Sequence, residues 1–399
     1  MDRIRRPGNH TMRRVITKPR ADWRPGLRKY PYGVRAMNAG AFWREDVRYE
    51  FSAHQIDLIE SVADELHTML REALRSAVDG RALARLGVRG GMARLLESSW
   101  NDYWAAGRLN ERAGALVGRL TLAYDGRDSV KLLACNYDTP EGLFAASIIQ
   151  RNWREALMAD ANQFNGLHEG LVERWEELAA GMPGRGLVHL ACATPDPVRE
   201  SELVYLAATA AEAGVATHLL PLQSLGWDGR RFIDDEGRAA SWLAKIYPWQ
   251  GLADDAFLQK LRMGGMSMLS PLWCWPMSNH GLLAILWALY PRHPNLCRAG
   301  LDAEDLAGCD AVTERSLFGL DDAAQRMTAH GRTVSDTGSA DFPGGRVWLE
   351  TPPIFEEEGV HALLHAWIVG DKCLGMSVRE SADPRVGSDA AMVPHIFRG

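Results

Sequence analysis

The sequence predicts a mixed α/β fold in a chain of 399 residues, and three segments carry this prediction. An apolar residue recurs every three or four positions through SAHQIDLIESVADELHTMLREALRSAVDG, which is typical of an amphipathic helix. RLTLAYDGRDSVKLLACNYD has the pattern of two strands joined by a turn. LVHLACAT, a helical segment and VATHLLPL follow one another over about 35 residues, which indicates a βαβ unit.

The predicted long helix has sequence signals at both ends. Ser52 and Gln55 have the spacing of a capping box, and Gly80 supplies a stop signal. One helical face collects the apolar residues Ile56, Ile59, Val62, Leu66, Leu70, Ala73 and Val78. We therefore expect this helix to pack one face against a core.

The predicted hairpin lies between this helix and a second helical region. Its strands cover 120–124 and 131–136, its turn contains Asp125 and Gly126, and it ends in a polar cluster. A helical stretch over about 142–178 follows, with an interruption after its first half.

The second half of the chain is predicted to be rich in strands. The helix of the βαβ unit ends at Gly214, and Gly229 and Gly237 mark the turns of a further hairpin. A strand then ends in AKIYPWQ, and HGLLAILWALY predicts a buried helix. The remaining segments are predicted to be short strands separated by Gly, Asp and Pro turns.

Composition excludes several classes of protein. Hydrophobic residues make up 46% and charged residues 24% of the chain, so a globular core is expected rather than general disorder. No apolar run approaches the roughly 20 residues of a membrane helix, so we expect no membrane association. The first residues lack the apolar region of a secretory signal, so export is not indicated.

The charge is distributed unevenly along the chain. Residues 1–20 contain seven Lys and Arg against one Asp, giving 7 − 1 = +6, so the remainder carries −6 − 6 = −12. We expect the basic segment 1–20 to be a solvated, disordered leader. The acidic remainder argues against nucleic acid as the main partner.

The six cysteines are scattered without a CxxC pair, and no Cys/His cluster has zinc spacing. We therefore expect free thiols and a cytoplasmic location. The motifs GxGxxG, GxxxxGK[ST], HExxH and GxSxG are absent, so composition and spacing alone name no reaction.

Eight segments in order give the chain a resemblance to the synthetase region of the glutathionylspermidine synthase family, a branch of the ATP-grasp ligases. They are AYDG at 123–126, KLLACNYDTP at 131–140, DANQFNGLHEGLVERW at 160–175, AKIYPW at 244–249, LAILWALYPRHPNL at 283–296, LFG at 317–319, AWIVGDKCLGMSVRE at 366–380 and VPHIF at 393–397. The resemblance implies an ATP-grasp-like synthetase with a pre-ATP-grasp, Rossmann-like βαβ region.

The resemblance also implies a domain organisation and a reaction. The N-terminal part of the synthetase covers 21–185, the βαβ region 186–250 and the ATP-grasp-like region 251–399. Family members use ATP and Mg²⁺ to convert a peptide carboxylate, that of glutathione, to an acyl phosphate, which an amine such as spermidine attacks. The expected partners are therefore a small peptide or carboxylate substrate and an amine acceptor.

Two arginines match the family positions that bind the substrate carboxylate. Arg119 precedes the first predicted strand, and Arg379 lies in the SVRE segment. The resemblance makes both catalytic candidates that stabilise developing negative charge. It also makes Arg119, Asp138 and Thr139 candidates for substrate binding.

The metal positions depart from the family pattern. Thr121 stands where the family has a metal-binding Asp, and Ala134 replaces the Glu that bridges two magnesium ions. Asn136 and Asp138 match the family, and Asn136 is the one candidate metal ligand carried over. Gln250 replaces the acid after Tyr-Pro-Trp. Because hard cations depend on anionic oxygen ligands, we expect magnesium affinity to fall sharply.

The nucleotide positions are altered as well. His280 replaces one lysine of the family, and Arg315 corresponds to the second. Leu320 replaces the loop arginine, and Asp321 and Asp322 bring negative charge where a phosphate is expected. His280 and Arg315 are therefore the remaining candidates for ATP binding.

Three hypotheses follow from these residues. The first is an ADP-forming carboxylate-amine ligase with ATP and Mg²⁺ as cofactors. The second is a pseudoenzyme or binding module that retains the fold and a carboxylate pocket and binds a peptide-like or carboxylate ligand, or a partner protein. The third is an altered mechanism with another activated donor. A shifted register, in which Asp125 or Asp138 supplies a metal ligand, also stays open.

Overall fold

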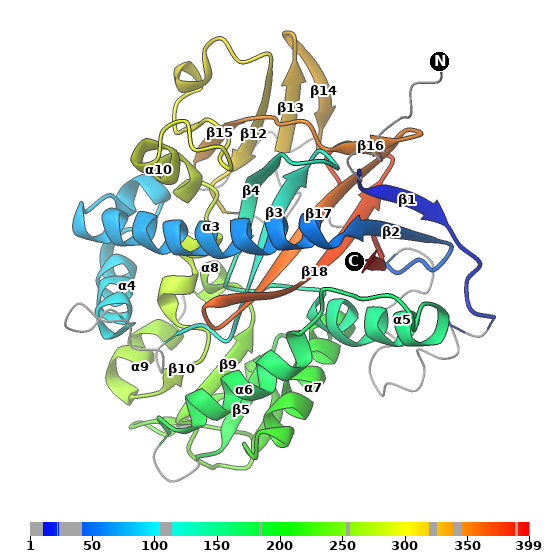
Figure 1. Cartoon of the computed structure of the whole chain (residues 1–399). Coiled ribbons are helices and arrows are strands. Elements are labelled where there is room, and N and C mark those ends of the chain that lie inside the picture. Colours follow the sequence, from blue (N-terminus) through cyan, green and yellow to red (C-terminus); the bar gives the residue numbers. More distant parts are fainter. Residues whose placement is uncertain are drawn as a thin grey trace, which may run out of the picture.

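The chain folds into layers of sheet and helix, as the computed structural model in Figure 1 shows. The structure describes residues 11–21, 23, 42–103, 114–182, 186–252, 256–318, 325–337, 345–387 and 390–398. Within these residues the strands form sheets of six, five, four, three and two strands. The mixed α/β class is confirmed.

The largest sheet is antiparallel and joins distant parts of the chain. Its strands lie in the order β19 (Ala391–Val393), β18 (Lys372–Ser381), β17 (Val360–Val369), β3 (Val117–Tyr124) and β4 (Val130–Asn136), and β16 (Phe355–Glu357) pairs with β17. Strands from the expected parts 21–185 and 251–399 therefore share one sheet.

Strands β3 and β4 are the predicted hairpin, and the predicted turn residues explain its geometry. Asp125 Oδ1 accepts hydrogen bonds from the backbone N–H groups of Arg127, Asp128 and Ser129 at 2.9, 3.1 and 3.0 Å. Gly126 has φ +83°, a left-handed conformation that favours glycine. The local sequence therefore sets the register of the hairpin.

The long helix α3 (Ala53–Asp79) crosses one face of this sheet (Figure 1). The capping box of Ser52 and Gln55 is present, so the predicted start is confirmed. Leu66 and Leu70 of α3 belong to the same buried cluster as Leu364 and Val378 of the sheet. The apolar side chains of α3 thus cover one face of the sheet and leave the other face to the candidate site.

A small three-stranded sheet brings the two ends of the described chain together. Its order is β1 (Arg13–Ile16), β2 (Val47–Ser52) and β20 (His395–Arg398), and β1 is antiparallel to β2. Met12 is buried beside it. The expectation of a disordered leader is therefore wrong for residues 11–20, because tertiary pairing orders this basic segment.

The predicted interrupted helical stretch follows the central hairpin. It contains a π-helical turn, η4 (Ala145–Ile149), and the helices α5 (Gln150–Leu157) and α6 (Leu167–Ala179). Trp153 and Trp175 are fully buried in the cluster between these helices and the neighbouring sheets.

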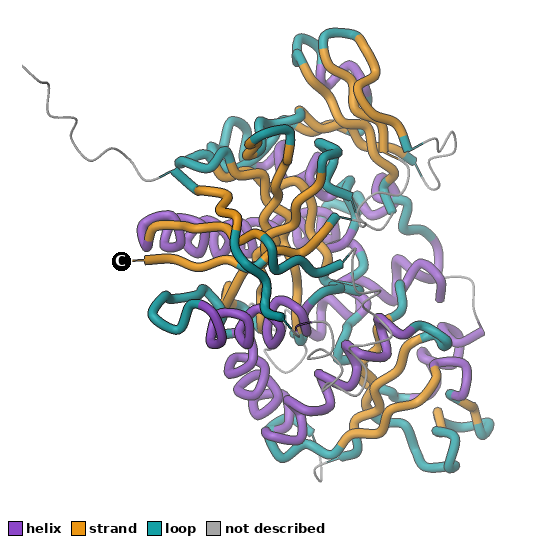
Figure 2. Tube along the Cα trace, turned by 90° about the vertical axis from the view of Figure 1, so that its right-hand side faces the viewer, coloured by secondary structure: helices purple, strands orange, loops and turns teal. Residues whose placement is uncertain are grey.

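The predicted βαβ unit is confirmed as part of a parallel sheet. Its strands lie in the order β10 (Ser267–Met268), β9 (Trp242–Ile246), β5 (Val188–Cys192) and β6 (Thr217–Pro221), and α7 (Pro197–Glu212) connects β5 to β6. Figure 2 shows helices packed beside these strands in the lower part of the molecule. The hairpin β7 (Gly226–Trp227) and β8 (Phe232–Ile233) and the helices α8 (Trp249–Leu252) and α9 (Ala256–Gly264) complete this region.

A five-stranded antiparallel sheet completes the C-terminal half. Its order is β11 (Ala299–Gly300), β15 (Arg346–Glu350), β12 (Ala311–Ser316), β13 (Gln325–Ala329) and β14 (Arg332–Asp336). The predicted buried helix is α10 (Leu282–Leu289), which packs against α3 and β11. The remaining elements are η1 (Leu83–Leu86), α4 (Gly90–Tyr103), η6 (Leu222–Ser224), η7 (Leu272–Cys274), η8 (Pro276–Ser278) and η9 (Ala303–Leu306).

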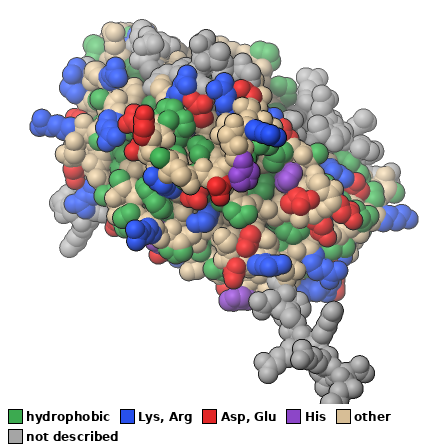
Figure 3. Space-filling model, turned by 90° about the horizontal axis from the view of Figure 1, so that it is seen from above, with side chains coloured by type: hydrophobic (Ala, Val, Ile, Leu, Met, Phe, Trp, Pro, Cys, Tyr) green, Lys and Arg blue, Asp and Glu red, His purple; other side chains and the backbone are tan. Residues whose placement is uncertain are grey.

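The surface and the cysteines match the composition. Among the described helices, none is both long and apolar enough to cross a membrane. All six cysteines are free, and five of them are buried. Figure 3 shows a face of the molecule on which Lys and Arg side chains are interspersed with Asp and Glu.

Candidate functional site

The sheet face opposite α3 gathers the sequence-predicted arginines. In β3, Leu120 and Leu122 belong to the core under α3. Because alternate residues point to opposite sides of a strand, Arg119 and Thr121 face away from that helix. Thr121 lies opposite Ala134 of β4 and His365 of β17. We call Arg119, Thr121, Ala134, His365 and Arg379 the arginine face.

The two arginines are buried beside aromatic rings. Arg119 is 3% exposed, donates from Nη1 to the Glu141 carbonyl oxygen at 3.0 Å and lies 6.0 Å from the centroid of the Trp367 ring. Arg379 is 6% exposed and lies 5.2 Å from the centroid of the Phe42 ring. A guanidinium held in low-dielectric surroundings attracts an anionic ligand more strongly than one in water.

The strand register also shows how far the backbone positions of the two arginines are offset along the strand direction. Arg119 is opposite Trp367, and Arg379 is opposite Leu363. Trp367 and Leu363 are four residues apart on β17, so the offset along the strand is about 13 Å. A ligand that contacts both arginines would therefore extend along the strand direction.

The positions expected to hold metal ions contain neutral side chains. Thr121 and Ala134 face one another across the hairpin, and neither has a carboxylate. Asn136 Oδ1 accepts from the backbone N–H of Asp138 at 3.2 Å and of Thr139 at 2.9 Å, and its Nδ2 donates to the Thr139 carbonyl at 3.1 Å. Asn136 therefore shapes the loop at residues 136–139, which we call the exit loop.

Asp138 is held in a buried ion pair. Its Oδ1 accepts from Lys245 Nζ at 2.6 Å, and its Oδ2 accepts from the Trp249 backbone N–H at 2.8 Å. Lys245 also donates to the Tyr247 carbonyl at 2.7 Å and lies 4.4 Å from the centroid of the Trp249 ring. Burial lowers the pKa of Lys245, and the Asp138 carboxylate opposes this shift. Asp138 thus anchors the exit loop to β9.

These residues do not fit a magnesium ion. Mg²⁺ requires near-octahedral oxygen ligands, with carboxylates prominent among those that a protein supplies. Thr121, Ala134 and Asn136 are neutral, and both oxygens of Asp138 are bonded within the protein. The carboxylate pair of the family motif has no equivalent at these positions.

The two candidate nucleotide residues have different surroundings. His280 is 4% exposed, and its Nδ1 lies 2.9 Å from the Ser316 carbonyl oxygen. Arg315 donates from Nη1 to the Leu133 carbonyl at 3.1 Å and lines a cavity of about 310 Å³. The altered loop residues Leu320, Asp321 and Asp322 lie outside the described residues.

This cavity lies between the five-stranded and six-stranded sheets, and we call it the intersheet cavity. Its lining includes Thr313, Gln325 and Leu349 from one sheet and His361 and Leu363 from the other. Its volume falls in the range of small-molecule sites. The sequence does not predict this cavity, because its walls come from strands that are far apart in the chain.

Two further groups support the site and were not singled out from the sequence. Glu202 of α7 is buried and accepts from the backbone N–H groups of Gly142 at 2.9 Å and Phe144 at 3.0 Å. Desolvation raises its pKa to about 7, although both hydrogen bonds lower it. The sequence indicates Lys245 only weakly, as the one cation in the apolar strand WLAKI.

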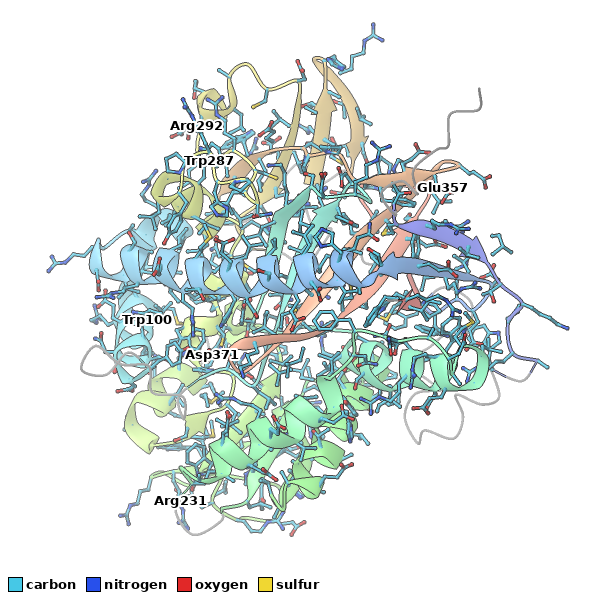
Figure 4. The ribbon with its side chains drawn as sticks, viewed as in Figure 1. Trp100, Arg231, Trp287, Arg292, Glu357 and Asp371 are labelled. Atoms are coloured by element: carbon cyan, nitrogen blue, oxygen red, sulfur yellow. The ribbon has the colours of Figure 1, made fainter. Side chains whose placement is uncertain are left out.

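A second network holds the exit loop from the side of α3. His67 Nδ1 lies 2.6 Å from the Tyr137 hydroxyl, and its Nε2 lies 3.3 Å from Asp371 Oδ1. Asp371 sits at the turn between β17 and β18, below α3 in Figure 4, and also pairs with Arg71 at 2.7 Å. A Cβ atom at Gly118 would lie 2.2 Å from the Tyr137 ring, so this glycine makes room for it.

One group of described residues has metal-ligand chemistry away from the arginine face. Ligand atoms of His218, Asp234 and Asp235 lie within 4.8 Å of one another. However, Asp234 Oδ2 already accepts from Arg238 Nε at 2.7 Å and lies 3.1 Å from His189 Nε2. Its Oδ1 accepts two backbone N–H groups, so we assign no ion here.

Two antiparallel sheets face one another across a cavity, next to a βαβ unit, and this arrangement is an ATP-grasp-type fold. A solved glutathione synthetase-like effector, GSS30 from Globodera pallida, is similar in fold, with a TM-score of 0.54 at 9% sequence identity. The similarity covers 94% of this chain and 96% of that chain.

The model of the family described as glutathionylspermidine synthase preATP-grasp matches residues 14–398. The chain therefore belongs to the glutathionylspermidine synthase family. It is 28% identical over 379 residues to a putative acid–amine ligase of Haemophilus influenzae, covering 92% of this chain and 93% of that relative. It is also 24% identical over 320 residues to the bifunctional glutathionylspermidine synthetase/amidase of Escherichia coli, covering 73% of this chain and 49% of that relative.

Proposed function

We propose that this protein binds a carboxylate ligand on the arginine face and does not carry out magnesium-dependent ATP turnover. The observation that carries the proposal is the contrast between Arg119 and Arg379, which remain cationic, and Thr121 and Ala134, which supply no anionic oxygen. The ligand is a small peptide or other carboxylate that extends along the strand.

The physical basis is the difference between anion and cation binding. A buried guanidinium binds a carboxylate with charge-assisted hydrogen bonds whether or not a metal ion is present. A magnesium–nucleotide complex also needs anionic oxygens from the protein. Family members that make an acyl phosphate need both capacities, and the described residues of this chain support only the first.

The intersheet cavity could bind a nucleotide independently of carboxylate binding on the arginine face. Its volume of about 310 Å³ suits a compact aromatic ligand, and Arg315 supplies a cation at its wall. Arg315 lines this cavity and His280 is not among its lining residues, so we assign phosphate contact to Arg315 rather than to His280. ATP, if it binds, is expected to do so without help from Mg²⁺.

The second candidate function is an active carboxylate-amine ligase with ATP and Mg²⁺ as cofactors and an amine acceptor. The specific support is the family match over residues 14–398 and the 93% coverage of the putative acid–amine ligase. In this function Arg119 and Arg379 orient the acid, and Asp138 and Thr139 line its binding site. We propose the cytoplasm as the location for either function, with no role for nucleic acid or membrane.

Titration calorimetry of the purified protein separates the two functions. Under our proposal, MgCl₂ leaves the affinity for ATP unchanged, and no ADP is released in the presence of glutathione and spermidine. Glutathione itself is used as the carboxylate probe, and Arg119→Ala is expected to weaken its binding about tenfold or more. Tight ATP binding that requires MgCl₂ in the wild-type protein would contradict the proposal and favour the ligase.

A pair of double variants tests the metal argument directly. Thr121→Asp with Ala134→Glu restores two carboxylates, and Thr121→Asn with Ala134→Gln has the same shapes without charge. We expect MgCl₂ to strengthen ATP binding only in the first variant, because only that variant supplies anionic oxygen ligands. Equal responses of the two folded variants would show that the missing carboxylates are not what prevents metal binding.

A further inference from the structure

A second cavity lies at the carboxyl ends of the parallel strands, and we call it the edge pocket. Its volume is about 320 Å³. Ala193 directly follows β5, Leu222 directly follows β6 and Tyr247 directly follows β9, and all three line the pocket. The pocket therefore lies outside the arginine face and the intersheet cavity.

The strand order explains why a pocket forms there. The chain runs from β5 to β6 on one side and then crosses to β9 on the other side of β5. The connection that leaves β5 runs to one side, and the connection that reaches β9 arrives on the other side, so a crevice opens between the carboxyl ends of β5 and β9. Open α/β sheets bind ligands in such crevices.

Aromatic side chains form much of the wall. The rings of Trp227 and Phe232 have centroids 5.1 Å apart at 73°, and Phe257 lies 4.9 Å from Phe232. A Cβ atom at Gly251 would lie 2.7 Å from the Tyr247 ring, so the glycine allows the phenol to lie against α8. Such walls match a flat aromatic ligand, which stacks edge-to-face or offset on aromatic side chains.

Three polar side chains of the pocket can donate hydrogen bonds. Trp227, Tyr247 and Lys260 line it with an indole N–H, a phenol O–H and an ammonium. Within the described part of the chain, no hydrogen bond or ion pair is recorded for these three side-chain groups. Among the described lining residues, Lys260 supplies a positive charge, which attracts an anion.

We propose that the edge pocket binds a planar aromatic carboxylate. The ring lies between Trp227, Tyr247 and Phe257, and the carboxylate accepts hydrogen bonds from Lys260 and the neighbouring donors. Burial of a flat ring on aromatic walls supplies affinity, and the ammonium selects for negative charge. The proposal is independent of the carboxylate site on the arginine face.

Two probes with the same ring and opposite charge test the chemistry. Indole-3-acetate and tryptamine are titrated into the full-length protein by calorimetry. We expect saturable binding of indole-3-acetate and no measurable binding of tryptamine. Tryptamine binding as tight as that of the acid, or failure of both to bind, would overturn the proposal.

Variants then test the site. Lys260→Met removes the ammonium and is expected to weaken indole-3-acetate binding about tenfold or more. Gly251→Ala is expected to weaken it as well, because the added methyl group displaces the Tyr247 ring. The exposed Lys372→Met is the matched control and leaves binding unchanged. Equal affinity in the Lys260 and Lys372 variants would overturn the assignment.

Hydrogen exchange of the wild-type protein locates the ligand without any variant. Saturating indole-3-acetate is expected to slow exchange in residues 222–232 and 247–252. Protection confined to β12 and β17 would place the probe in the intersheet cavity and overturn the proposal. Arg119→Ala is expected to retain this binding, which separates the edge pocket from the arginine face.

Discussion

The arginine face and the exit loop meet at the hairpin of β3 and β4, where Arg119 lies opposite Asn136, yet they use polar groups in different ways. In the exit loop, Asn136 and Asp138 are bonded to other parts of the same chain. On the arginine face, Arg119 remains cationic while Thr121 and Ala134 carry no charge. Arg119, which also matches the family, donates to the Glu141 carbonyl oxygen as well. Residues that match the family motif thus have partners within the chain. The hydrogen-bond partners of a residue that matches a family motif should therefore be examined before the residue is assigned as a ligand.

The largest effect that tests this comparison is expected from Asp138→Asn. The change leaves the Lys245 ammonium, 2% exposed, without its counter-ion. We expect the free energy of unfolding to fall by about 3–5 kcal/mol in urea denaturation, as for other buried pairs that lose one partner.

An exposed ion pair provides the control for this measurement. Arg398 and Asp160 pair at 2.9 Å with both side chains largely exposed, so Asp160→Asn should leave stability unchanged. If Asp138→Asn proved as stable as the control, the exit loop would not be anchored by this pair. Asp138 would then be available to a ligand, as the family resemblance implies.

Local patterns explain what could be predicted from the sequence. The capping box at Ser52 and the turn at Asp125 depend on neighbouring residues, and both form as expected. The pair of Asp138 and Lys245 joins residues 107 positions apart, so no spacing rule announces it. His361 and His365 lie four residues apart in the sequence, and this spacing does not indicate that His365 belongs to the arginine face. Its place opposite Thr121 follows from long-range strand pairing.

For the basic segment 1–20, the composition predicts disorder, and this prediction fails for the described residues 11–20. Its composition favours a solvated chain, but residues 11–20 include strand β1, which is ordered by pairing with β2. Arg14 also donates from Nε to Glu380 at 2.8 Å, and this carboxylate is buried. Tertiary partners therefore override a composition rule that is sound for an isolated segment.

A second, intermediate effect is expected from pH. Glu202 supports the backbone after the exit loop, and burial raises its pKa from 4.5 to about 7. The folded state thus keeps a proton that the unfolded state has lost between these two values. The contribution of Glu202 to the free energy of unfolding should be largest below pH 4.5 and should fall by about 1.4 kcal/mol per pH unit up to about pH 7.

Urea denaturation of the wild type and Glu202→Gln between pH 4.5 and 8 isolates this contribution. The variant cannot titrate at this position, so the difference between the two curves should contain the slope assigned to Glu202. The variant also loses one of the two backbone hydrogen bonds and is expected to be less stable at pH 5. Parallel curves would mean that Glu202 is ionised in the folded protein.

The smallest effect is expected from Tyr137→Phe in the exit loop. It removes the 2.6 Å contact with His67 and keeps the ring stacked on the imidazole, with centroids 5.6 Å apart. We expect a loss of about 1 kcal/mol in urea denaturation, the usual net value of one hydrogen bond. Tyr290→Phe, which removes an exposed contact with Glu72, is the control and should change little.

A loss in Tyr137→Phe that exceeded the loss in Asp138→Asn would reverse the ranking. The exit loop would then be held mainly from the side of α3, and the ion pair with Lys245 would be free to open towards a ligand.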